Sequence, residues 1–134
     1  MGSVDLGRAV LEGVALSGRH VLDALEASAG SVEALTCGGG GFQSDPWGQI
    51  RADVVGRPMT RLAVNAPVVL GAAAMAAVGA GHVATLADAQ AAVARYDKVW
   101  TPDPDKRGLY DQLFGLYLEA VAANAGIGRK LALL

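Results

Sequence analysis

The residues of this chain whose type and spacing point most directly to chemistry are the four consecutive glycines at positions 38–41. They lie in the stretch TCGGGGFQSDPWGQIRADVVGRP, between a short apolar run and the start of an expected helix. Four glycines in a row are costly, because glycine loses more conformational freedom on folding than other residues. Bare backbone lets a ligand approach closely, and free N–H groups at a helix start favour an anion. The pattern is typical of a phosphate or nucleotide site, and a tight strand-to-helix connection is the alternative.

The stretch matches neither of two common phosphate-binding motifs. A P-loop would need a Gly-Lys-Ser/Thr after the glycines, and a dinucleotide fingerprint would need spaced rather than contiguous glycines. On the residue pattern alone, the ligand site and the tight connection therefore stay open.

Other residue types predict no catalytic or metal chemistry. Asp53 follows Trp47 by six positions, off the apolar face of the expected helix, which favours a structural hydrogen bond over catalysis. Cys37 ends an apolar run and is interpreted as a small apolar filler rather than a nucleophile. His20 and His82 have no Cys or His nearby. We therefore predict no catalytic residue and no metal ligand in this chain.

Composition limits the class of protein. The chain has 134 residues, of which 52% are apolar and 18% charged, with a net charge of −2. This length fits one domain, and the absence of a basic segment argues against a nucleic-acid partner. The sequence shows no signal peptide, and its longest weakly polar run is too short to span a bilayer, so a soluble cytoplasmic protein is expected. The large apolar share suggests that a partner covers part of the surface.

The elements before the glycines are a long helix and a short strand. Residues 4–28 are predicted to be helical, because apolar residues recur at helical spacing. The stripe comprises Leu6, Val10, Val14, Val21 and Leu25. Glu12, inside this apolar helix, is interpreted as a buried hydrogen-bond partner, although the sequence names no mate for it. The apolar run at 32–37 favours a buried strand.

After the glycines, Asp45 and Pro46 predict a helix start, with Asp45 as the N-cap and Pro46 at the first helical position. The expected inner face of this helix comprises Trp47, Ile50 and Val54. Gly56 is expected to end it, and a second strand is predicted at 58–64.

Helices fill most of the remaining chain. The Ala- and Gly-rich residues 67–81 are interpreted as a buried helix, and Thr85 with Asp88 has the spacing of a capping box. Asp103 before Pro104 predicts a cap for the last long helix. Its packing stripe comprises Tyr110, Leu113, Phe114, Tyr117, Ala120 and Val121. Two strands make no stable sheet alone, so either further strands exist or the sheet is completed from outside this chain.

Residues 36–58 also carry a spaced pattern: a glycine-rich turn, a serine, a tryptophan, then Gln-hydrophobic-x-Ala-Asp-hydrophobic-hydrophobic-Gly-x-Pro. Its positions are Gly39, Gly40, Gly41, Ser44, Trp47, Gln49, Ala52, Asp53, Gly56 and Pro58. This pattern resembles the adenosine-binding motif of the FGGY family of carbohydrate kinases. Three more stretches resemble the family in the same order: RAVLEGVA at 8–15, LGAAAMAAVGAG at 70–81 and PDPDKRGLYDQLFGLY at 102–117. The resemblance therefore covers nearly the whole chain.

The resemblance implies an α/β fold: part of the ribonuclease H-like (actin-like ATPase) second lobe, helix-rich with a small sheet. It implies ATP or ADP as the ligand, with Mg²⁺ in the complete enzyme, and phosphoryl transfer to a sugar or polyol hydroxyl. Gly39, Gly40 and Gly41 are implied to lie against the adenosine and α-phosphate, and Ser44 near the adenine edge. Phe42 departs from the family, which usually has a small residue there, and this bears on the width of the adenine pocket.

We therefore expect residues 1–134 to form a single domain, the C-terminal, nucleotide-side segment of a sugar kinase without its N-terminal lobe. Because the resemblance places the sugar site and the catalytic base outside this chain, the chain alone should transfer no phosphoryl group. The expected partners are a nucleotide and either the missing lobe or further copies of the chain, most simply as a homodimer. The alternative is a non-enzymatic, helix-rich, homo-oligomeric module or kinase remnant that binds no nucleotide.

Overall fold

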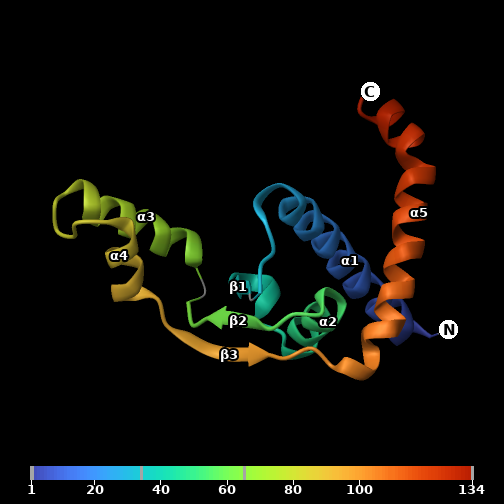
Figure 1. The fold of residues 1–134 in the computed structure, drawn as a ribbon, viewed down its shortest axis with the longest axis horizontal. Coiled ribbons are helices and arrows are strands. Elements are labelled where there is room, and N and C mark those ends of the chain that lie inside the picture. The colour runs from blue at the N-terminus through green and yellow to red at the C-terminus, as the bar shows by residue number, and fades with distance from the viewer. Residues whose placement is uncertain (1, 34, 65, 134) are drawn as a thin grey trace.

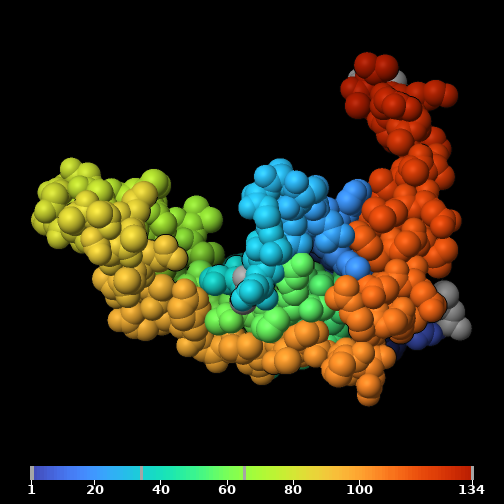
Figure 2. Space-filling view, viewed as in Figure 1, coloured from blue at the N-terminus to red at the C-terminus, as the bar shows by residue number. Residues whose placement is uncertain are grey.

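A computed structural model of the chain describes residues 2–33, 35–64 and 66–133. The elements in chain order are α1 (Ser3–Ala29), β1 (Leu35–Cys37), the 3-10 turn η1 (Gly40–Phe42), α2 (Asp45–Val55), β2 (Met59–Leu62), α3 (Pro67–Gly79), α4 (Leu86–Val93), β3 (Tyr96–Trp100), the 3-10 turn η2 (Pro104–Lys106) and α5 (Arg107–Leu131). Figure 1 shows an elongated molecule in which α3 and α4 form an arm at one end and α5 extends from the other. Figure 2 shows a deep notch between this arm and the central body.

The two predicted strands are present but shorter than predicted, and a third strand joins them. Position 34 of the predicted strand 32–37 lies outside the described residues. The strand order is β1-β2-β3, with β1 parallel to β2 and β2 antiparallel to β3. The parallel pair is joined through α2, as a crossover connection requires. In the described part of the chain β2 is central, so β1 keeps one edge without a strand partner.

The sequence interpretation missed β3. Its residues YDKVW give no clean alternation, and only Trp100 of this strand is buried. The strand exists because Met59 lies opposite Trp100 in the antiparallel register, which is a contact between distant parts of the chain.

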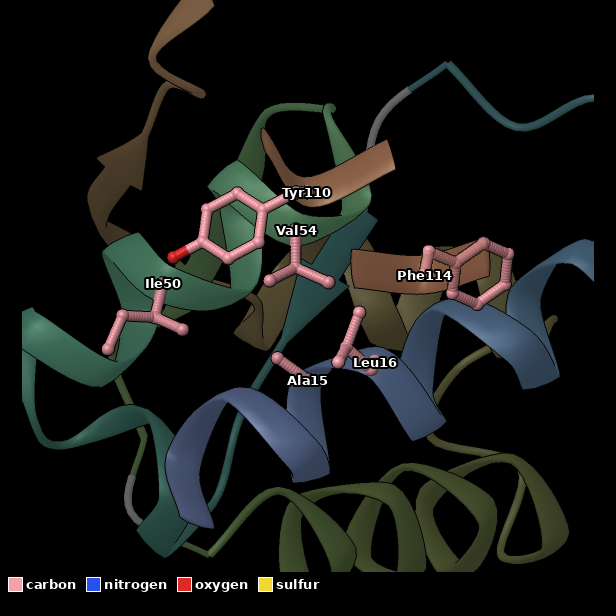
Figure 3. Packing of buried hydrophobic residues seen from close by; sticks show 6 residues of the cluster. All are labelled: Ala15, Leu16, Ile50, Val54, Tyr110 and Phe114. Carbon is pink, nitrogen blue, oxygen red and sulfur yellow. The ribbon is translucent and has the colours of Figure 1, made fainter. Parts of the chain in front are cut away.

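The core is built around α2, which packs on helices on one side and on the sheet on the other. The first cluster comprises Ala15, Leu16, Ile50, Val54, Tyr110 and Phe114, from α1, α2 and α5 (Figure 3). The second cluster comprises Cys37, Ala52, Met59 and Trp100, between α2 and the sheet. Of the predicted inner face of α2, Ile50 and Val54 are buried and Trp47 is half-buried. Cys37 is a buried filler as predicted, and burial raises the pKa of its thiol.

The apolar stripe that helical spacing identifies on α1 does not face this core. Leu6, Val10, Val14, Val21 and Leu25 are between 47% and 64% exposed. The helix instead buries Ala15, Leu16 and Leu22, which belong to a neighbouring face. The helix therefore has two apolar faces, and the other described elements cover only one of them.

The prediction that residues 67–81 form a buried helix is wrong about burial. The helix forms as α3, but none of its residues is buried, and Val68, Val69 and Met75 are well exposed. Its small side chains permit close packing, yet α3 packs mainly on the neighbouring α4. In α5 the predicted stripe is covered from Tyr110 to Tyr117, whereas Ala120 and Val121 are exposed.

The helix-end signals are mostly confirmed. Gly56 ends α2 in the left-handed conformation at φ 72°, which glycine adopts without strain. The Thr85 hydroxyl accepts the amide hydrogen of Asp88. The prediction that Asp103 caps the last long helix is wrong about the element: Asp103 caps the preceding turn η2 by accepting from the amide of Asp105, and Lys106 is the N-cap of α5. The prediction that Asp45 is the N-cap of α2 is wrong: Ser44 occupies that position and Asp45 is already helical. Within the described ranges, no helix is both long and apolar enough to cross a membrane.

Candidate functional site

The four glycines differ in what surrounds them, and this separates packing from ligand access. A Cβ added to Gly38 would lie 3.2 Å from the ring of Pro67, and one added to Gly41 would lie 3.1 Å from the Arg51 guanidinium. These two glycines therefore lie in close packing, where an added side chain would require its neighbour to move by a few tenths of an ångström. A Cβ added to Gly39 or Gly40 would meet nothing within 4 Å. Gly39 has φ 91°, a conformation that only glycine adopts readily.

Backbone and side-chain hydrogen bonds hold the loop in shape. The Phe42 amide donates to the Gly39 carbonyl at 3.0 Å, which closes the turn η1. From β2, Arg61 Nη1 donates to the Phe42 carbonyl at 3.1 Å. Both Arg61 Nε and Nη2 also donate to the carboxylate of Asp97 on β3, at 2.8 and 2.9 Å. The loop is thus anchored to the sheet, and its bare face at Gly39 and Gly40 points to open space.

An aromatic clamp lies directly beside the loop. The Arg51 guanidinium carbon is 4.3 Å from the ring centre of Phe42 and 4.0 Å from that of Trp47. A cation between two aromatic faces is stabilised by about 0.5–2 kcal/mol for each ring. Phe42 also contacts Trp100, with ring centres 6.1 Å apart. Phe42 is therefore part of this stack, which explains how the loop accommodates a large residue where the family has a small one.

Ser44 lies where α2 begins. Its carbonyl accepts the amide hydrogen of Gly48 at 2.9 Å, while its hydroxyl makes no capping hydrogen bond to the helix. The neighbouring Asp45 carboxylate pairs with Lys98 on β3 at 3.1 Å. The Ser44 side chain is exposed, on the same connection as the bare glycines.

Asp53 has a structural role, as its position in the sequence favoured. It is 2% exposed and accepts three hydrogen bonds. Gln49 Nε2 donates at 2.7 Å, and the amide of Asp103 and the Lys106 ammonium each donate at 2.9 Å. Because these donors come from α2, from residue 103 and from η2, Asp53 ties α2 to the segment that leads into α5.

Glu12 has a hydrogen-bond partner that the sequence did not identify. The buried Tyr110 hydroxyl donates to Glu12 Oε1 at 3.0 Å, and Arg8 donates to both groups at 2.8 and 3.2 Å. Burial raises the pKa of Tyr110, and its hydrogen bond to Glu12 adds to the effect. This network joins α1 to α5 and lies outside the glycine loop.

Metal-ligating side chains are scattered in the described part of the molecule. Within residues 2–33, 35–64 and 66–133, no three His, Cys, Asp or Glu side chains group together as a metal site. His20 packs edge-on against the ring of Tyr117, with ring centres 5.9 Å apart. Mg²⁺ that accompanies a nucleotide is held mainly by phosphates and water with one or two carboxylates, and such a site needs no cluster of protein ligands.

Comparison with known proteins identifies relatives that match most of the chain. Residues 2–80 match the sequence model of the C-terminal domain of the FGGY family of carbohydrate kinases. The chain is 30% identical over 113 residues to a xylulose kinase of Staphylococcus epidermidis, covering 84% of this chain and 23% of that protein. It is 39% identical over 77 residues to the autoinducer-2 kinase of Escherichia coli, covering 58% of this chain and 14% of that protein.

Solved structures give the same result. The xylulose kinase from Rhodospirillum rubrum superposes with a TM-score of 0.76 and 34% identity, over 91% of this chain and 25% of the kinase. The gluconate kinase from Lactobacillus acidophilus superposes with a TM-score of 0.79 and 28% identity, over 90% of this chain and 24% of the kinase. The expected fold class, a helix-rich part of an actin-like ATPase lobe with a small sheet, is confirmed. The chain spans about a quarter of the length of these kinases and belongs to the FGGY family of carbohydrate kinases, whose C-terminal domain it carries.

Proposed function

We propose that this chain is the adenosine-binding C-terminal portion of an ATP-dependent sugar or polyol kinase. The observation that carries the proposal is the bare face of the glycine loop at Gly39 and Gly40, within a chain that belongs to a kinase family. A phosphate-bearing ligand can approach this backbone closely because no side chain intervenes.

Each residue of the proposed nucleotide site contacts a particular part of the nucleotide. Gly39 and Gly40 present bare backbone toward the adenosine and α-phosphate, and Gly41 adds a backbone surface whose other side packs on Arg51. Ser44, with a hydroxyl that caps no helix, contacts the adenine edge. When bound, ATP supplies the γ-phosphoryl group that the complete kinase transfers to a hydroxyl. The residues of this chain bind and orient the nucleotide, and Arg61 holds the loop rigid for that purpose.

We also propose that the isolated chain transfers no phosphoryl group. Asp53 is the only buried charged residue among those described, and its oxygens are engaged by Gln49, Asp103 and Lys106. The proposal therefore places the catalytic base and the sugar site in the remaining three quarters of a complete kinase. On this view residues 1–134 form one domain that depends on the rest of the enzyme for chemistry.

A second proposal concerns assembly. The exposed stripe of α1 and the open edge of β1 favour an interaction module, because exposed apolar patches and unpaired strand edges are typical of interfaces. In isolation the chain would cover the α1 stripe by pairing with a second copy, as a homodimer.

The binding proposal is tested by NMR titration of the isolated chain with ADP. We expect shifts confined to Gly39, Gly40, Gly41 and Ser44, with a dissociation constant near millimolar, about −4 kcal/mol. Gly40→Val should abolish these shifts, because a branched side chain would fill the bare face. The control is Gly126→Val on exposed α5, where an added Cβ also meets nothing within 4 Å. If saturating ADP moves no loop resonance, the loop is only a connection between β1 and α2.

A further inference from the structure

An apolar groove of about 350 Å³ lies beside the glycine loop, between α1 and β1. Its walls include Val14, Val21 and Leu25 from the exposed stripe of α1, with Leu35 of β1 and Phe42 of the loop on the other side. Arg51 is the single charged residue in this lining. The groove is therefore apolar along its length, with one cation beside the loop.

Arg51 differs from the other arginines that lie against the body of the molecule. Arg8, Arg19, Arg57, Arg61 and Arg107 each pair with a carboxylate. Among the described residues, Arg51 makes no ion pair or hydrogen bond and is held only by its two aromatic neighbours. Partial burial lowers the pKa of Arg51, because the charged form loses water. The guanidinium has thus lost part of its water without gaining an acceptor from the described residues, and its N–H groups can bind one.

The groove also adjoins an incomplete sheet. Leu35 belongs to β1, whose outer edge has no strand partner in the described part of the chain. The kinases that superpose on this chain are about four times as long, so a large part of such an enzyme must pack somewhere on this domain. The open edge beside the apolar walls favours polypeptide as the occupant, and the unpaired cation favours an occupant with a negative charge.

We propose that Arg51 is a docking residue, and that the kinase segment seated in this groove places an aspartate or glutamate carboxylate on its guanidinium. This inference rests on the proposed function, since it takes the occupant from the rest of a kinase. Phe42 and Trp47 fix the guanidinium plane, which leaves its N–H groups for the incoming carboxylate. A guanidinium–carboxylate contact of this kind is strong and directional. It selects an acidic segment over an equally apolar neutral one.

The probes are overlapping 15-residue peptides covering the part of the Rhodospirillum rubrum xylulose kinase that this chain does not match. Each peptide is made twice, once native and once with every Asp and Glu replaced by Asn and Gln. Binding is followed through the indole N–H resonance of Trp47, assigned with Trp47→Phe. We expect at least one native peptide to bind, and its amide twin to bind at least about tenfold more weakly, because a hydrogen bond to a charged group is lost.

Variants assign that difference to Arg51. The Arg51→Met variant should bind the native peptide and its amide version equally. The Arg51→Lys variant keeps the positive charge and should therefore retain part of the preference for the native, acidic peptide. Arg129→Met, near the exposed end of α5, should behave as the unmodified chain. Three results would each overturn the proposal. The unmodified chain could bind the native and amide peptides equally, Arg51→Met could keep the preference for the native peptide, or no peptide could bind at all.

Three further measurements distinguish a kinase segment from other ligands that could bring a carboxylate or phosphate to Arg51. Sodium octanoate binding through Arg51 without peptide binding would make the groove a lipid site. An ADP-induced shift of the Arg51 Nε–H resonance would assign Arg51 to the nucleotide. A change from dimer to monomer in Arg51→Met would mean that a second copy supplies the acid. Each of these results contradicts the docking role, whereas an Arg51 Nε–H resonance that ADP does not move and an unchanged mass agree with it. Failure of ADP to bind would contradict the proposed function without affecting the peptide result.

Discussion

Gly48→Ala should destabilise the protein, although alanine is the better helix former. Gly48 lies inside α2 with Trp100 against it, and an added Cβ would lie 2.7 Å from Trp100 Cδ2 and closer still to Cε2 and Cζ2. Trp100 is 3% exposed and packed among Cys37, Ala52 and Met59, so its ring cannot swing into solvent. Overpacking of a core costs about 1–3 kcal/mol, and replacing glycine in a helix regains about 1 kcal/mol. Because the clash is with rigid ring atoms, its cost lies near the upper end of the overpacking range. The free energy of unfolding should therefore fall by about 1–2 kcal/mol in total.

The measurement is urea denaturation of Gly48→Ala at neutral pH, followed by circular dichroism. Gly115→Ala in α5 is the matched control, because the same substitution there meets open space and should stabilise by about 0.5–1 kcal/mol. Combining Gly48→Ala with Trp100→Leu should remove most of the penalty, since the clashing ring is gone. If Gly48→Ala is as stabilising as Gly115→Ala, the close packing of α2 on β3 is wrong and so is the support it gives the glycine loop.

Three other outcomes follow from the structure. Stability should fall on acidification below about pH 4: hydrogen bonds from Arg61 and Arg19 hold the pKa values of Asp97 and Asp111 below their ordinary range. A carboxyl group whose pKa is lower in the folded state than in the unfolded state stabilises the fold above the unfolded pKa, and this stabilisation is lost as the pH falls through the folded pKa. The midpoint of urea unfolding, measured between pH 7 and pH 3, should therefore fall with pH. A midpoint that does not change over this range would contradict the prediction. The isolated chain should release no ADP from ATP with any sugar or polyol, in a coupled assay with an intact xylulose kinase as positive control; sugar-dependent turnover that survives purification would refute this. Light scattering over a dilution series should give a dimer that Val21→Glu dissociates; a monomer at every concentration would show that the exposed stripe of α1 is tolerated without a partner.

Local signals in the sequence located the ends of elements well. Gly56 and Thr85 each act through hydrogen bonds or dihedral angles within a few residues, so their roles are confirmed without knowledge of the rest of the fold. The glycine loop is likewise local, and its spaced pattern was enough to identify the family. What the pattern could not show is that Gly38 and Gly41 serve packing, because Pro67 and Arg51 reach the loop only through the tertiary fold.

The predictions that were wrong or incomplete have a common cause, because each feature depends on contacts between segments that are distant in the sequence. β3 depends on the pairing of Trp100 with Met59, and no feature of its own residues required a strand. The burial of α3 was misjudged because small side chains show that close packing is possible, not that a partner is present. The Arg51 clamp could have been found in part, since Trp47 and Arg51 are four residues apart on one helix face. Phe42 joins them only because the turn η1 folds back.

The open features of this domain are better explained by one missing partner than by several. Leu35 and Thr36 are consecutive in β1, so their side chains point to opposite faces of the sheet. Leu35 lines the groove beside Arg51, whereas Thr36 lines a second apolar groove with Leu70 of α3 and Tyr96 of β3. An uncovered groove therefore borders β1 on each face, and β1 is one of the two edge strands of the sheet. A homodimer through α1 would cover one groove and leave the other exposed. A partner that continues the sheet past β1 and packs on both faces would cover both grooves, as a layered α/β fold requires. The remainder of a kinase of this family has the size to do this, and Arg51 marks where its acidic side chain should be found.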